Sequence, residues 1–192
     1  MKTTLAFVLA LLVTAGALLA EEAETFTPDR IPDASLVDQD GRPVLFHRDL
    51  VAGKVVVVNF VFTTCTTICP PMGASFGKLQ KSLGERAGKD VFLISISIDP
   101  AIDTPERLLA WAEKFGRAPG WSLVTGTKPE ITAVLRSLGA YVGNKLDHAP
   151  IALVGRDGGE WLRVSGLTNP EKVIAAIDRV AASGDVRPAA EE

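Results

Sequence analysis

Residues 55–72 read VVVVNFVFTTCTTICPPM, and this stretch decides how the rest of the chain is read. Its first eight residues form an almost continuous run of β-branched and aromatic side chains, which favours a central strand covered on both faces. Two threonines then lead to Cys65 and Cys69, and Pro70 and Pro71 suit the first turn of a helix. Both cysteines of the protein therefore lie in one strand-to-helix turn, with three residues between them.

The composition is that of one ordinary globular domain. The chain has 192 residues, of which 47% are hydrophobic and 22% are charged, and its formal net charge is −3. This charge and the lack of a long basic run argue against nucleic-acid binding. No internal repeat or low-complexity segment is present, and we expect a monomer.

The first twenty residues have the layout of an export signal. Lys2 precedes an uncharged run over residues 5–20, and Glu21 follows it. The run is short of the roughly 20 residues that span a bilayer, so we favour a cleaved signal peptide over an uncleaved membrane anchor. In either case we expect a flexible linker over residues 21–32 and a protein body in the periplasm or on the outer face of the inner membrane.

Strands alternate with helices along the body of the chain. The expected elements are a hairpin over residues 35–47, strands over 54–62, 90–99, 121–125, 151–154 and 160–165, and helices over 72–86, 103–115, 128–138 and 170–182. This order predicts an α/β fold with a mixed central sheet flanked by helices. It is the layout of a thioredoxin-like fold with an N-terminal β-hairpin extension. We place this domain at residues 33–183 and a flexible tail at 184–192.

The cysteine turn suits either redox exchange or the binding of a soft metal. A helix N-terminus lowers the pKa of a neighbouring cysteine, and open α/β sheets place their sites at the carboxyl ends of strands. His148 precedes the strand at 151–154, in a loop that approaches the redox turn in the thioredoxin arrangement. Together, Cys65, Cys69 and His148 would suit copper in either oxidation state better than zinc. An exposed loop histidine is the equally weighted alternative.

Two simpler interpretations concern the remaining histidine and the cysteine pair. His47 is interpreted as a surface or capping histidine rather than a ligand, since no cysteine is close to it in sequence. A purely structural disulfide is disfavoured, because a bridge across three residues restrains the unfolded chain very little.

Three motifs resemble the Sco/SenC family of exported thioredoxin-like copper proteins. FTTCTTICPPM resembles the family's CxxxCP motif, and SISIDPAIDTPERLLAWAEKFG resembles its strand that ends in Asp-Pro before Asp-Thr-Pro and a helix. LDHAPIALVGRDG resembles its Asp-His pair before a strand and a turn. The resemblance implies that Cys65, Cys69 and His148 bind Cu⁺ or Cu²⁺. It also implies a partner, the cytochrome c oxidase subunit that carries the dinuclear copper site, or another exported copper protein.

The residues around these motifs carry two further expectations. Asp147, Asp99 and Asp103 are candidate outer-shell residues, although helix capping and strand termination are the favoured roles for the last two. The chain departs from the family after the histidine, where Ala149–Pro150 follow in place of a serine or threonine. Thioredoxins keep a cis-proline here, so we predict a cis peptide bond at Ala149–Pro150.

Three functions compete for the cysteine turn. A copper metallochaperone, a binding protein rather than an enzyme, is the leading hypothesis. A thiol–disulfide oxidoreductase acting on exported or oxidase-subunit cysteines, with Cys65 and Cys69 as its redox pair, is the main alternative, but its expected motif is CxxC. A peroxiredoxin-like peroxidase is disfavoured because Phe62 stands where that family has a proline. The first two functions are compatible, since copper binds only the reduced dithiol.

Overall fold

Eight strands form one mixed sheet in the order β1-β8-β7-β4-β5-β6-β2-β3. The structure is a computed structural model, and it describes residues 23–166 and 169–183. The strands are β1 (Glu24–Phe26), β2 (Ser35–Asp38), β3 (Pro43–Leu45), β4 (Val55–Val61), β5 (Val91–Ser97), β6 (Trp121–Gly126), β7 (Ile151–Arg156) and β8 (Trp161–Ser165).

The strand β4 lies in the middle of the sheet because its side chains suit burial on both faces. Six of its seven residues are buried. It pairs in parallel with β5, from Val55 opposite Val91 to Val61 opposite Ser97, and antiparallel with β7. The next strand, β6, continues the parallel part, whereas β2 and β8 are antiparallel to their neighbours. The carboxyl ends of β4 and β5 therefore meet at one end of the sheet, where the cysteine turn follows.

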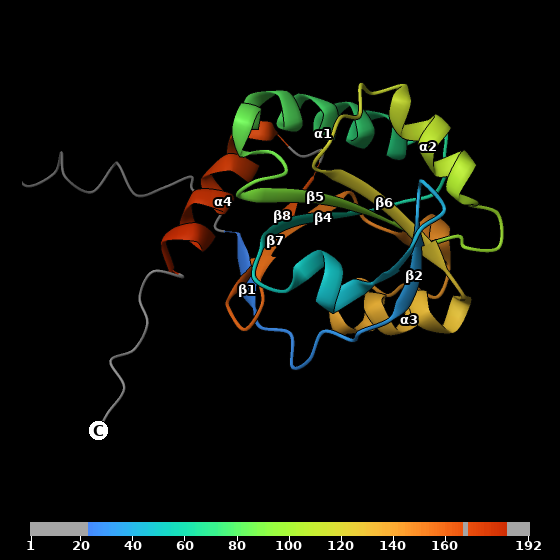
Figure 1. Cartoon of the computed structure of the whole chain (residues 1–192), viewed down its shortest axis with the longest axis horizontal. Helices are drawn as coiled ribbons and strands as arrows, with labels where there is room; N and C mark the ends of the chain where they lie inside the picture. The colour runs from blue at the N-terminus through green and yellow to red at the C-terminus, as the bar shows by residue number, and fades with distance from the viewer. Residues whose placement is uncertain (1–22, 167–168, 184–192) are drawn as a thin grey trace, which may run out of the picture.

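Helices cover both faces of the sheet (Figure 1). They are α1 (Cys69–Leu83), α2 (Pro105–Glu113), α3 (Lys128–Ser137), α4 (Pro170–Ser183), the π-helix η1 (Phe46–Val51) and the 3-10 turns η2 (Gly84–Arg86) and η3 (Lys145–Asp147). The helices α1, α2 and α4 share one apolar cluster with the sheet. The helix α3 and η1 pack on the opposite face in a second cluster.

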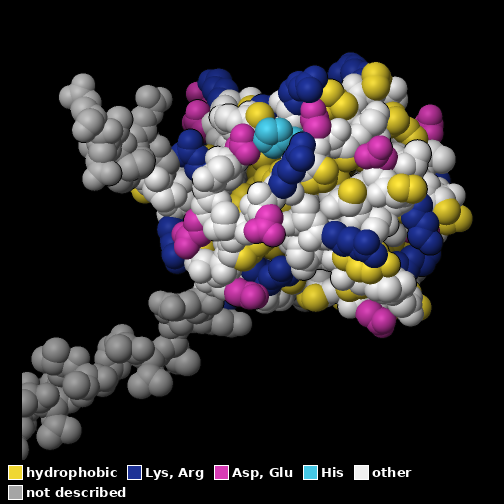
Figure 2. All heavy atoms as spheres, turned by 90° about the horizontal axis from the view of Figure 1, so that it is seen from below, with side chains coloured by type: hydrophobic (Ala, Val, Ile, Leu, Met, Phe, Trp, Pro, Cys, Tyr) yellow, Lys and Arg dark blue, Asp and Glu magenta, His cyan; other side chains and the backbone are white. Residues whose placement is uncertain are grey.

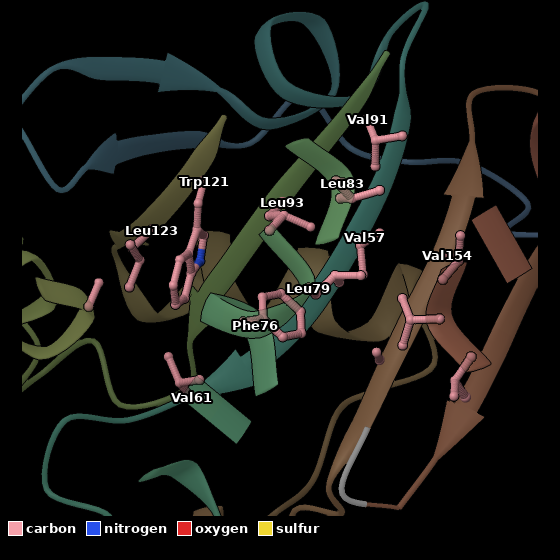
Figure 3. Packing of buried hydrophobic residues seen from close by; sticks show 14 of the residues in the cluster. Val57, Val61, Phe76, Leu79, Leu83, Val91, Leu93, Trp121, Leu123 and Val154 are labelled. Atoms are coloured by element: carbon pink, nitrogen blue, oxygen red, sulfur yellow. The ribbon is translucent and has the colours of Figure 1, made fainter. Parts of the chain in front are cut away.

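The alternation of side chains along β4 divides the core into these two clusters. Val57 and Val61 point toward α1, whose Phe76 and Leu79 lie over them (Figure 3). The ring of Phe76 also contacts Trp121 of β6, with 5.8 Å between ring centroids. Because apolar side chains recur on one face of α1, this helix buries a stripe against the sheet and its first turn is held in place above the carboxyl end of β4.

Two glycines in α1, which weaken the helix by sequence alone, are needed for packing. A Cβ atom at Gly77 would lie 2.1 Å from the carbonyl oxygen of Phe115, just after α2. A Cβ at Gly73 would lie 2.4 Å from the ring of the same Phe115. Glycine therefore lets the chain after α2 approach α1 closely, at a cost of about 1 kcal/mol per residue in helix propensity.

The structure confirms the mixed sheet with flanking helices and the N-terminal hairpin, and it differs from the expected elements in local detail. The second hairpin strand ends at Leu45, and His47 lies in the π-helix that follows. The first long helix begins at Cys69 rather than at residue 72. Residues 24–26, within the predicted linker, form β1 and pair with β8.

The prediction of a cis Ala149–Pro150 bond is wrong. No cis peptide bond occurs in the part of the chain that the structure describes. The trans form is the intrinsically favoured state even before proline, and here the extended backbone of His148 leads directly into β7. The predicted signal segment at 1–20 and the tail at 184–192 lie outside the described residues. Within those residues, no helix has the length and apolar character of a membrane span.

Candidate metal centre

Cys65 and Cys69 lie at the carboxyl end of β4, around the first turn of α1. The backbone N–H of Cys65 donates to the carbonyl of Phe62 at 3.1 Å, which closes the turn after the strand. The backbone N–H of Cys69, the first residue of α1, points at the sulfur of Cys65, with 3.4 Å between nitrogen and Sγ. Both are free thiols, and both are buried. The N-terminus of α1 therefore acts on Cys65, the more exposed of the two.

The two thiols differ in acidity. Burial raises the pKa of Cys65, but hydrogen bonds from the Cys69 side chain and backbone and from Thr67 outweigh it and bring this pKa below its ordinary value of 9.0. Burial raises the pKa of Cys69 to about 12, with further contributions from its hydrogen bond to Cys65 and from the charges of Cys65 and Asp103. Cys65 is therefore the first of the pair to become a thiolate, and Cys69 holds its proton in the metal-free protein.

His148 approaches the cysteines from the segment between α3 and β7. Its Nδ1 lies 2.8 Å from the carbonyl oxygen of Lys145, which can only accept, so Nδ1 carries the proton. Its Nε2 then presents a lone pair toward Cys69, with 3.7 Å between Nε2 and Sγ. Burial lowers the pKa of His148, partly offset by the hydrogen bond to Lys145. The imidazole is thus held neutral, in the tautomer and orientation that a metal ligand needs.

Asp103 is a buried carboxylate that fixes the cysteine turn to the sheet. It is 1% exposed, and its Oδ1 accepts from the backbone N–H and the hydroxyl of Thr63, at 3.0 and 2.6 Å. Its Oδ2 accepts from the hydroxyl of Ser97, the last residue of β5, at 2.7 Å. The N-cap of α2 is Thr104, whose side chain accepts from the backbone of Arg107. Asp103 therefore supports the cysteine turn, while its neighbour caps the helix.

Asp99 plays a matching role on the histidine side. Its carboxylate forms a close ion pair with the ammonium group of Lys145, which also lies 5.1 Å from the centre of the Phe62 ring. That ring in turn meets His148 edge-on, at 5.4 Å between centroids. Asp147, the third candidate aspartate, is exposed, and its side chain makes no ion pair with any described residue. Asp99 thus holds the segment that carries His148.

The structure places the other histidine far from this centre. His47 lies in η1, before the start of β4, whereas the cysteines follow its end. Its Nε2 pairs with Asp157 at 2.9 Å, and the two side chains are 32% and 41% exposed. This is the surface arrangement that its sequence context predicts.

The donor set of the three residues fits a soft metal ion. Metal bonds of about 2.3 Å to sulfur and about 2.05 Å to nitrogen would span the distance from Cys69 Sγ to His148 Nε2 at an angle of about 115°. Among residues 23–166 and 169–183, no three His, Cys, Asp or Glu side chains are already arranged around one ion position. A metal ion held by all three residues would therefore require these side chains to move closer together.

Sequence patterns alone did not identify Lys145, Thr63 or Ser97 as parts of the centre. Thr63 and Ser97 are hydroxyl residues at or just after the ends of mostly apolar strands, which was the available signal. No sequence signal pointed to Lys145, because its contacts to Asp99 and Phe62 join residues that are 46 and 83 positions apart in the chain.

Comparison with known proteins gives one consistent result. The sequence model of the SCO1/SenC family matches residues 22–182. A SCO1 protein homolog of Bacillus subtilis (strain 168) is 34% identical over 141 residues, which are 69% of this chain and 72% of that protein. Further curated relatives are longer, and the chain covers between 31% and 52% of their length.

Solved structures agree with this assignment. ScoI of Bradyrhizobium japonicum, solved with copper bound, is 28% identical, with a TM-score of 0.62 over 79% of this chain and 99% of that one. BsSco, described as having a disulfide switch and as a member of the Sco family of cytochrome c oxidase assembly proteins, is 30% identical, with a TM-score of 0.65 over 84% and 94%. The chain therefore belongs to the SCO1/SenC family.

Proposed function

We propose that the protein is a copper metallochaperone that binds one copper ion through Cys65, Cys69 and His148. The observation that carries the proposal is the neutral imidazole of His148, whose Nε2 faces the sulfur of Cys69 at 3.7 Å. Two sulfurs and one imidazole nitrogen are soft to intermediate ligands, the set that copper favours. The copper-bound structure of the related ScoI supports the same choice of metal.

The acidities of the ligands suggest an order of events during loading. Cys65, with its lowered pKa, supplies the first thiolate and meets the incoming ion. Cys69, whose pKa is raised to about 12, must lose its proton as the metal binds, because a thiolate and not a thiol is the ligand. His148 is already neutral and only has to move its Nε2 onto the ion. Copper binding therefore releases a proton from Cys69, and affinity rises with pH.

The same geometry provides a way to hand copper over as cargo. Cys65 and His148 are each 8% exposed, whereas Cys69 is fully buried. A recipient's ligands therefore displace the two outer ligands first and Cys69 last. The recipient that we propose is the oxidase subunit with the dinuclear copper site, or another exported copper protein. The exchange takes place in the periplasm or on the outer face of the inner membrane.

A thiol–disulfide oxidoreductase remains the second candidate, for one specific reason. Cys65 has a lowered pKa and lies against the amide of Cys69, so it is placed to attack or form a disulfide with its partner. The disulfide switch described for BsSco supports redox chemistry of this pair. Since a Cys65–Cys69 disulfide has no thiolate left to offer, oxidation would stop copper loading.

An anaerobic titration of the reduced exported chain with cuprous and cupric ions tests the proposal. We expect one tightly held copper per chain, lost in Cys65→Ser and weakened in His148→Ala. His47→Ala is the matched control, because it removes the same side chain far from the cysteines. If all three variants bind copper as the wild type does, the metallochaperone is rejected and the reduction potential of Cys65–Cys69 becomes the decisive quantity.

A transfer assay tests the partner separately. Copper-loaded protein is mixed with the metal-free soluble domain of the oxidase subunit, and copper is followed on both after separation. Net movement of copper to the oxidase domain supports the assembly role. If the chain binds copper tightly but transfers none to the oxidase domain, this partner is rejected, while the proposal that the chain binds copper still stands.

A further inference from the structure

Large apolar side chains are exposed at one end of the molecule. Among the described residues, the exposed large hydrophobic side chains are Ile102, Tyr141 and Leu146, at 43%, 46% and 73%. Ile102 lies in the turn between β5 and α2, and the other two lie in the segment between α3 and β7. These are the two segments that the Asp99–Lys145 ion pair joins. Apolar side chains gathered in this way mark an interaction surface.

A pocket opens between these two segments and α3. Its volume is about 330 Å³, which is at the small end of ligand-binding cavities and takes one or two side chains. Ile98, Ile131 and Leu135 supply apolar walls, and Tyr141 lines it from the loop. Ile102 and Leu146 directly follow lining residues 101 and 145, so each of these two segments carries an exposed apolar side chain next to a lining residue.

The charges around the pocket favour an acidic occupant. Lys128, Lys145 and Asp99 line it, and the last two neutralise each other. Lys128, the first residue of α3, has no side-chain hydrogen bond or ion pair with any described residue. On the face of the molecule that is seen in Figure 2, Lys and Arg side chains lie among hydrophobic ones and occur on both halves.

The pocket is joined to the metal centre through Lys145. Lys145 lines the pocket and pairs with Asp99, which also lines it, while the backbone carbonyl of Lys145 accepts from Nδ1 of His148 at 2.8 Å. A molecule in the pocket therefore touches the segment that orients a copper ligand.

We propose that this pocket is the docking site for the partner protein in copper exchange, and that it takes a segment with a carboxylate beside a large apolar side chain. The carboxylate pairs with Lys128, and the apolar side chain enters between Tyr141 and Leu135. A protein segment is the occupant because Ile102 and Leu146 extend the apolar surface beyond what a small molecule would cover. The identity of the partner rests on the proposed function, but binding in the pocket requires no copper.

The first test uses a peptide and the metal-free reduced chain. The probe is an acetylated and amidated hexapeptide with two aspartates and two phenylalanines, titrated while backbone amide signals are followed by NMR. We expect shifts at Lys128, Tyr141 and Lys145, and binding about fivefold weaker when the aspartates are replaced by asparagines. The same loss is expected in Lys128→Glu, a variant that should fold because glutamate suits the first turn of a helix.

Lys89→Glu is the matched control, since Lys89 precedes β5 at the opposite end of the sheet and its ion pair is with exposed Glu85. It should bind the peptide as the wild type does. Equal binding of both peptides, equal affinities of the two lysine variants, or shifts spread away from the pocket would each overturn the docking site.

The second test measures copper transfer to the soluble domain of the oxidase subunit. Lys128→Glu and Tyr141→Ser should each slow the second-order transfer at least about fivefold. The first changes a charge at the rim, which acts mainly on association, and the second removes an aromatic wall of the pocket. Their copper affinities should match that of the wild type. Transfer at the wild-type rate by both variants contradicts the proposal. A failure of copper binding itself would remove the proposed function, while the peptide titration still decides whether the pocket binds an acidic apolar segment.

Discussion

The two sides of the metal centre are held in very different ways. The cysteine side lies between β4 and α1, where Cys69 is fully buried and Asp103 joins the turn to β5 by three hydrogen bonds. The histidine side is a connection between α3 and β7 with only the short turn η3, and its contacts to the domain near His148 are the Asp99–Lys145 ion pair and the ring of Phe62. Two of the three proposed ligands thus lie in the folded core, whereas the third lies in a segment with fewer contacts to that core.

The largest effect is expected on the cysteine side, from Asp103→Ala. The substitution leaves the Thr63 amide, the Thr63 hydroxyl and the Ser97 hydroxyl without their acceptor, so the free energy of unfolding should fall by about 3 kcal/mol. Denaturant unfolding of the reduced metal-free chain measures it.

Asp99→Ala is the control from the histidine side. Its carboxylate is 13% exposed and binds a lysine that is 36% exposed, so the cost should stay near 1 kcal/mol. If the two alanine variants lose the same stability, the contrast between a rigid and a loosely held side is wrong.

The second expectation separates the two thiols on the cysteine side. Cys69 has a pKa of about 12, and the pKa of Cys65 lies below 9.0, so their thiolate fractions near neutral pH differ by about a thousandfold or more. Lower nucleophilicity of the more acidic thiol offsets part of this, which leaves Cys65 reacting about 30-fold faster. Timed alkylation with iodoacetamide, read by mass spectrometry, gives both rates. Preferential labelling of Cys69 would reverse the assignment.

The third expectation concerns acid and the histidine side. The pKa of His148 is lowered from 6.5 in the folded chain, so below that pH the unfolded chain binds a proton that the folded chain excludes. The free energy of unfolding should therefore fall as the pH drops below 6.5, by at most about 1.4 kcal/mol per pH unit from this group. Denaturant titrations of the metal-free chain should show a smaller slope in His148→Gln. If the slope of unfolding free energy against pH is unchanged in His148→Gln and reduced in His47→Gln, the pH dependence does not come from His148.

The smallest effect is expected from Lys145→Met. This change removes the ion pair with Asp99 and keeps an aliphatic side chain near Phe62. The free energy of unfolding should therefore fall by less than about 1 kcal/mol relative to the wild type. Backbone amide exchange should accelerate between residues 139 and 150 and stay unchanged in α1. Copper affinity should fall by about tenfold, as when a ligand loses its support. Faster exchange in α1 would show that the two sides are not independent.

The sequence predicted the cysteine side better than the histidine side because its signals are local. The apolar run of β4, the two cysteines and the following prolines lie within eighteen consecutive residues. His148 lies 79 positions from Cys69, and its approach was inferred from the layout of the fold and from the family resemblance. Long-range contacts of this kind leave no periodic pattern along the chain.

The same limit explains what the sequence missed. Asp103 looked like a helix cap because it precedes Thr104 and Pro105, whereas its carboxylate binds Thr63, 40 positions earlier. The strand β1 has three partly or fully exposed residues and no alternation to predict it, and it is fixed by pairing with β8. The trans bond before Pro150 shows that analogy with another protein's turn does not set the isomer.

The direction of β1 decides at which end of the sheet the described chain begins. It pairs antiparallel with β8, with Glu24 opposite Arg163 and Phe26 opposite Trp161, so the chain enters the sheet while running away from the metal end. The other end of β8, at Ser165, lies beside Ile151, three residues after His148. The first described residue, Ala23, therefore lies toward the end of the sheet where the cysteine turn and His148 lie.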